Sequence, residues 1–162
     1  MPTAIEIATQ LIQHYEECVL HPYQREGDRP TIGWGNTFWE NGTPVTMDDK
    51  AIDQARADTL FVFWLTDFNS KIAPHVLSAK PNELAAFLSL AYNIGVNAFL
   101  ASSALRLFLR ADSVAAGNAI ELWDKSDDIV LKGLQRRRRA EHLVYDGTDV
   151  LAAVAQAEAQ FP

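Results

Sequence analysis

The sequence predicts one α+β domain that is mostly helical and has a small β lobe near its N-terminus. Three observations indicate this class: a helix start at Thr3, a short β segment at Thr31–Trp34, and no strand pattern from Pro81 onward. We expect residues 1–162 to form a single domain. Its β lobe should span about residues 18–45, and its helical lobe about residues 75–162 together with the N-terminal helix.

Composition and charge restrict the function classes. The net charge of −7 argues against nucleic-acid binding, which needs a basic face, and disfavours tight adsorption to anionic surfaces. A single cysteine, Cys18, excludes an internal disulfide, and without a Cys/His cluster no metal site is expected. No apolar run approaches the roughly 20 residues of a membrane span, and no export signal or membrane anchor is expected.

The first predicted helix runs from Thr3 to Glu17. Thr3 and Glu6 match a capping box, and apolar residues follow at helical spacing. At about 100° per residue, Glu16 falls at the edge of the apolar stripe and Glu17 almost opposite it. We therefore expect Glu16 to be half-buried, as a general acid is, whereas an exposed acid at a frayed helix end is the alternative.

Pro22 is expected to end helical geometry, because the residue before a proline is disfavoured in a helix. Residues 25–28 predict a turn, and Thr31–Trp34 predicts a returning strand that brings the Thr31 hydroxyl towards Glu16. The glycines of this segment indicate either close approach of a ligand or backbone, or turn chemistry alone. Two to three short strands are expected.

The rest of the chain reads as helices. Thr46 and Asp49 predict a helix start, and two helices are expected before Pro74 ends the stretch at about Ile72. The next helix is apolar on nearly every side and should form the buried centre of the larger lobe. The later helices are predicted over residues 84–92, 102–110, 113–123, 134–145 and 149–160.

Four consecutive arginines allow two interpretations. Helical phase places Arg136 and Arg137 on or beside a packed face and turns Arg138 and Arg139 towards water. An arginine on a packed face requires a buried acid, and Glu16 is the candidate, with Arg137 as its favoured partner. The alternative is a solvated basic helix face.

Several motifs together resemble the phage-type lysozymes, the endolysins of glycoside hydrolase family 24. Each motif is weak alone, but their order is specific, as are the steps of nine residues from Glu16 to position 25 and fifteen to Thr31. The resemblance implies a lysozyme-like fold, in which a long helix joins a β-hairpin lobe to a larger helical lobe and a cleft lies between them. The motifs are Tyr-Glu at 15–16, Thr-Ile-Gly-Trp-Gly-Asn-Thr at 31–37, Ala-Tyr-Asn-Ile-Gly-Val at 91–96, Ser102, Trp123, and Gly-Leu-Gln-Arg-Arg-Arg at 133–138.

The resemblance implies hydrolysis of the β-1,4 bond between N-acetylmuramic acid and N-acetylglucosamine in peptidoglycan. Glu16 matches the general acid, and Thr31 matches the threonine beside the attacked carbon. A monomer held in the host cytoplasm until its release to the cell wall is implied, with no cofactor. The implied cleft positions that contact sugars are Thr37, Tyr92 and Ser102, with Asn93 beside Tyr92 on the same rim.

Arg25 departs from the family pattern, which usually has Asp at this position and less often Cys or Asn. Glycosidases normally use a second carboxylate, and a guanidinium cannot act as base or nucleophile. Three interpretations remain: Glu26 or Asp28 takes over, Thr31 orients the water while Glu16 carries most of the rate, or activity is largely lost. We expect an active but weakened enzyme.

Two other classes remain open. A lysozyme-like module could bind glycan or a protein partner without cutting it, which Arg25 and the acidic balance would allow. A purely structural helical protein would lack a polar sugar site.

Overall fold

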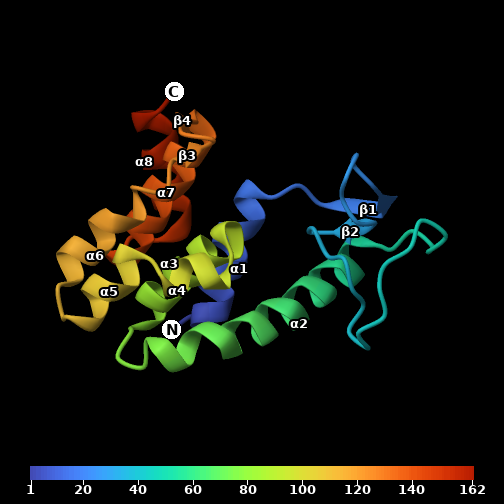
Figure 1. The fold of residues 1–162 in the computed structure, drawn as a ribbon, viewed down its shortest axis with the longest axis horizontal. Helices are drawn as coiled ribbons and strands as arrows, with labels where there is room; N and C mark the ends of the chain where they lie inside the picture. Colours follow the sequence, from blue (N-terminus) through green and yellow to red (C-terminus); the bar gives the residue numbers. More distant parts are fainter. The chain divides into compact units, whose positions relative to one another are not determined.

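A computed structural model describes residues 1–162, and the chain divides by its internal contacts into two compact units (Figure 1). Unit 1 comprises Met1–Ile12 and Phe68–Pro162, and unit 2 comprises Gln13–Asp67. The structure is mostly helical, with two small two-stranded antiparallel sheets, which confirms the predicted fold class. None of the helices combines the length and apolar composition needed to span a membrane.

Helix α3 (Pro81–Ile94) is the buried centre of unit 1, as predicted. The ring of Phe87 lies 5.3 Å, between centroids, from each of the rings of Phe99, Phe108 and Tyr145. These three rings come from helices later in the chain, so helices of unit 1 pack around Phe87 of α3. Gly95 follows it with a φ of 92°, a conformation that suits glycine after a helix end.

The other helices of unit 1 follow local capping signals. Ser102, Asp112 and Asp149 each accept a hydrogen bond from a backbone N–H of the helix that they precede, which confirms the predicted starts. Helices α7 (Lys132–Tyr145) and α8 (Val150–Gln160) run side by side (Figure 1). The sequence did not predict α4 (Val96–Leu100). The elements are η1 (Ala73–His75), α4 (Val96–Leu100), α5 (Ser103–Leu109), α6 (Ser113–Ile120), α7 (Lys132–Tyr145) and α8 (Val150–Gln160).

Unit 2 has its own small core. It contains the end of α1 (Ala4–Tyr15), strands β1 (Val19–Tyr23) and β2 (Thr31–Gly33), and the first part of α2 (Gln54–Ile72). The core comprises Ile32, Val45 and Leu60, against which three partly buried side chains pack, those of Trp39, Ile52 and Trp64.

Two predictions about the start of this unit were wrong. Helix α1 ends at Tyr15, not Glu17, and the chain is already a strand at Pro22. Strand β1 pairs with β2 alone, and the register is irregular between Val19 and Tyr23. Proline is tolerated in an edge strand of this kind, and strand pairing, not proline, redirects the chain.

The helix predicted from Thr46 is also absent, and α2 is one helix instead of two. Thr46 and Asp49 do form the expected local hydrogen bond, 2.8 Å from the backbone N–H to the carboxylate. The backbone N–H of Ile52 then donates to the carbonyl of Leu20 in β1 at 2.8 Å. This contact with the strand replaces a helical turn, so α2 begins only after Asp53.

A second hairpin in unit 1 contradicts the expectation of no strands after Pro81. Strands β3 (Lys125–Ser126) and β4 (Ile129–Val130) pair across a two-residue turn. Both turn residues, Asp127 and Asp128, have positive φ values of 50° and 62°, as tight hairpin turns require. Two-residue strands are too short to show an alternating pattern.

The arginines of α7 are more buried than predicted. Arg138, expected in water, is fully buried, and its Nη2 donates to Glu141 Oε1 at 2.9 Å. Arg139 is half-buried and donates to Glu121 at 2.9 Å. Because α7 packs against α3, α6 and α8, its buried arc is wider than one apolar stripe. This environment excludes the solvated basic face.

Two helical glycines of unit 1 provide a matched test of this packing. A β-carbon on Gly117 in α6 would lie 2.8 Å from the ring of His142, and that ring hydrogen-bonds Glu121 at 2.5 Å. A β-carbon on Gly133 in α7 would meet nothing within 4 Å.

We expect Gly117→Ala to destabilise the protein by about 1–3 kcal/mol, because the tethered ring cannot give way. Gly133→Ala should stabilise it by about 0.4–1 kcal/mol, because alanine restricts the unfolded chain. Urea unfolding measures both free energies, and stabilisation by both substitutions would contradict the packing described for His142.

Candidate functional site

The predicted site residues divide between the two units. Unit 2 contains Glu16, Arg25, Glu26, Thr31 and Thr37, and unit 1 contains Tyr92, Asn93, Ser102 and Arg137.

Glu16 is the first residue after α1 and is half-buried, whereas Glu17 is exposed. This difference is the expected one, although both acids lie beyond the helix from which it was predicted. Strand β1 begins three residues after Glu16, and its first residue, Val19, lies opposite Gly33 in β2. The acid is therefore connected by a short segment to β1, the strand that pairs with β2, and Thr31 is the first residue of β2.

Thr31 lies opposite Tyr23 in the hairpin and is half-buried. Its hydroxyl donates a hydrogen bond to the carbonyl of Arg29 at 2.9 Å. With the hydroxyl hydrogen used in this way, the oxygen can accept a hydrogen bond from a water molecule or a sugar hydroxyl.

Arg25 lies in the exposed turn between the two strands. Its guanidinium carbon is 6.0 Å from the centroid of the Tyr23 ring, and the turn is closed by a 3.0 Å hydrogen bond from the Asp28 N–H to the Arg25 carbonyl. Glu26 and Asp28 are also exposed. All three charged side chains of the turn therefore face water.

Thr37 lines a shallow hollow of about 170 Å³ in unit 2, together with Gly35, Asn36, Phe38 and Trp64. The hollow has a rigid wall, because the Trp64 indole donates to the Phe38 carbonyl at 2.9 Å. An aromatic wall beside a hydroxyl is a surface to which a sugar can bind.

A half-buried carboxylate that the sequence did not single out joins three segments of unit 2. Asp58 Oδ1 accepts hydrogen bonds from Gln13 at 3.3 Å, from the Trp34 indole at 2.7 Å and from Gln54 at 2.9 Å. The spacing from Gln54 to Asp58 predicts only the contact within the helix. The other two contacts depend on tertiary structure.

Cys18 lies near this carboxylate. Burial raises the pKa of the Cys18 thiol, the hydrogen bond from Gln54 opposes that rise, and the Asp58 charge adds to it. The thiol therefore stays protonated at neutral pH and is a poor nucleophile.

The unit 1 residues differ in exposure. Tyr92 is half-buried with its ring 6.0 Å from that of Phe68, while Asn93 is exposed. Ser102 is 4% exposed and its hydroxyl accepts from the Leu105 N–H at 3.2 Å, so it caps α5. Ser102 also lines an open hollow of about 380 Å³.

Arg137 is buried beside a fully buried acid. Its Nε lies 3.3 Å from Glu141 Oε1, which also accepts from the Ser89 hydroxyl at 2.7 Å. The predicted requirement for a buried acid is thus met within α7. The pairing of Arg137 with Glu16 stays a prediction.

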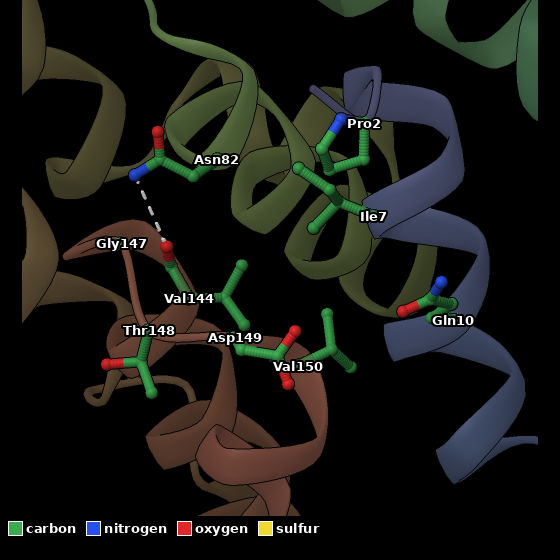
Figure 2. A pocket seen from close by; sticks show the side chains of 9 residues that line it. All are labelled: Pro2, Ile7, Gln10, Asn82, Val144, Gly147, Thr148, Asp149 and Val150. Carbon is green, nitrogen blue, oxygen red and sulfur yellow. Dashed lines mark hydrogen bonds between the residues drawn. The ribbon is translucent and has the colours of Figure 1, made fainter.

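A further hollow of about 230 Å³ in unit 1 contains none of the predicted residues (Figure 2). On one side of it, Asn82 donates to the carbonyls of Val144 and Tyr145, at 3.3 and 2.6 Å. The Asn82 amide therefore satisfies the last carbonyls of α7 and fastens α3 to that helix end.

Metal-ligating side chains do not gather in this structure. Across residues 1–162, no three His, Cys, Asp or Glu side chains lie close enough together to hold a metal ion.

Comparisons with known proteins agree with this structure. The phage lysozyme family model matches residues 13–141. An endolysin of Acyrthosiphon pisum secondary endosymbiont phage 1 is 30% identical over 140 residues, which cover 84% of this chain and 92% of that protein. An endolysin of Lactococcus phage c2 is 34% identical over 138 residues, covering 81% of this chain and 54% of that protein, so the match spans about half its length.

A solved structure shows the same fold. A mutant of P22 lysozyme superimposes with a TM-score of 0.78 at 28% identity, covering 91% of this chain and 100% of that one. Since the family model covers most of the sequence and the fold agrees over nearly all of it, this chain belongs to the phage lysozyme family and is a peptidoglycan hydrolase of the glycosidase class.

Proposed function

We propose that this chain cleaves the β-1,4 bond between N-acetylmuramic acid and N-acetylglucosamine, with Glu16 as the general acid. The observation that supports this most is the half-buried carboxylate placed directly after α1, three residues before the strand that pairs with β2. Its neighbour Glu17 is exposed, so only one of the two acids has this setting.

In the proposed reaction, Glu16 gives its proton to the glycosidic oxygen as the bond from the sugar carbon to that oxygen breaks. A water molecule attacks the carbon, bonds to it through its oxygen and releases one proton to the solvent, which reprotonates Glu16. Thr31 accepts a hydrogen bond from this water, since the Thr31 hydroxyl hydrogen is directed to Arg29. We propose Thr37, Tyr92, Asn93 and Ser102 as sugar contacts and Arg137 as a supporting residue.

The proposed substrate is peptidoglycan alone, bound by a monomer. With a net charge of −7, the chain lacks the bulk attraction that nucleic acid or an anionic surface would need. Recognition would therefore come from the sugar site.

A second candidate is a module that binds peptidoglycan and cuts it weakly or not at all. Arg25 favours it, because a guanidinium stands where the family usually has a carboxylate and its charge opposes a cationic transition state. Purified protein that binds peptidoglycan but releases no reducing ends would establish this candidate.

The Glu16 role predicts a contrast between adjacent acids. Glu16→Gln should lower the rate of clearing of permeabilised Gram-negative cells by about 10²–10⁴-fold, the usual contribution of a general acid. Glu17→Gln is the matched control and should clear cells at the wild-type rate. Equal clearing by both variants would exclude Glu16 as the proton donor.

The Arg25 position predicts a gain of activity. Two unit charges about 6 Å apart in water interact by about 0.7 kcal/mol. Exchanging a positive for a negative charge at that distance from a cationic transition state therefore stabilises it by about 1.4 kcal/mol, which is about tenfold in rate. Arg25→Asp should therefore raise kcat by that factor, measured as reducing ends released from purified peptidoglycan.

Two further variants separate the interpretations of the missing carboxylate. If Glu26 substitutes for it, Glu26→Gln loses activity while Asp28→Asn, in the same exposed turn, does not. If Thr31 orients the water unaided, both variants keep the wild-type rate. No gain from Arg25→Asp would show that charge at position 25 does not limit the reaction.

A further inference from the structure

One oxygen of Asp58 joins three segments of unit 2. Gln13 is in the last turn of α1, Trp34 directly follows β2, and Gln54 opens α2, the helix that carries Asp58. Hydrogen bonds to a charged acceptor are roughly twice as strong as neutral ones, so this cluster is a strong local restraint.

The hydrogen bonds from Gln13 and Trp34 join Asp58 to parts of the chain distant in sequence, next to the proposed catalytic groups. Gln13 lies three residues before Glu16, and Trp34 lies three residues after Thr31. The Asp58 carboxylate therefore restrains both the helix end that carries the proton donor and the strand that carries the hydroxyl, within one compact unit.

Backbone packing fixes α2 against β2 at the same place. Gly33 has a φ of 65°, and a β-carbon there would lie 3.5 Å from the β-carbon of Ala57, the neighbour of Asp58. That distance is an ordinary van der Waals contact, and it shows that the end of β2 lies against α2 beside Asp58.

We infer that Asp58 is a positioning residue for the proposed reaction, which sets the placement of Glu16 relative to Thr31 through Gln13 and Trp34. This inference rests on the proposed function. A carboxylate suits the role, because it only accepts hydrogen bonds and has room for several donors. An asparagine would offer only one acceptor oxygen, and its amide group, which is a donor, would oppose the donors of Gln13, Trp34 and Gln54.

The test is steady-state hydrolysis of solubilised peptidoglycan by Asp58 variants. Asp58→Ala should lower kcat by about 10- to 100-fold, the effect of displacing a reacting group by about 1 Å. KM should stay within about twofold, because Asp58 is not proposed to contact substrate. Asp58→Asn should recover part of kcat.

Arg56→Ala is the matched control on the same helix. It removes the paired hydrogen bonds to Glu40, at 2.5 and 2.7 Å, and so perturbs unit 2 without touching the Asp58 cluster. We expect its kcat to stay at the wild-type value even where its loss of thermal stability equals that of Asp58→Ala. The Trp34 indole N–H resonance should shift in Asp58→Ala and not in Arg56→Ala.

The outcomes are distinguishable. Wild-type kcat in Asp58→Ala, or an equal loss in Arg56→Ala at equal stability, would overturn the positioning role while leaving the proposed function standing. A wild-type protein that releases no reducing ends would overturn the proposed function and this inference with it.

Discussion

The hydrogen bonds to Asp58 are the constraint on which unit 2 depends. Strands of five and three residues form a hairpin that is too small to be stable alone, and its apolar core is small. A half-buried carboxylate that accepts from Gln13, Trp34 and Gln54 adds directional restraint where apolar burial supplies little. These polar contacts add to the apolar packing of the segments around Glu16 and Thr31, where Ile32 is fully buried.

Unit 1 contains a fully buried cluster of charged side chains, whereas Asp58 in unit 2 is half-buried. Arg137 and Arg138 share Glu141 as a partner, and Ser89 from the central helix donates to the same carboxylate. Removing one member of such a cluster leaves an uncompensated buried charge, which is strongly destabilising. The two buried arginines of α7, Arg137 and Arg138, thus have a structural role.

The sequence predicted what depends on local signals. The helix starts near residues 102, 113 and 149 and the exposure difference between Glu16 and Glu17 were predicted from neighbouring residues. Contacts between distant segments could not be predicted. The Ile52 N–H donates to a β1 carbonyl where a helix was predicted, Arg138 is fully buried, and Asp58 accepts a hydrogen bond from a side chain 45 residues away.

The unusual chemical feature of the proposed site is the exposed arginine at position 25, nine residues after the proposed proton donor Glu16. The most direct test of the account is to digest purified peptidoglycan, reduce the new ends with borohydride and identify the reduced sugar by mass spectrometry. Cleavage of the proposed bond predicts reduced N-acetylmuramic acid, formed only while Glu16 is intact. Reduced N-acetylglucosamine, or the same product from a chain lacking that carboxylate, would contradict it.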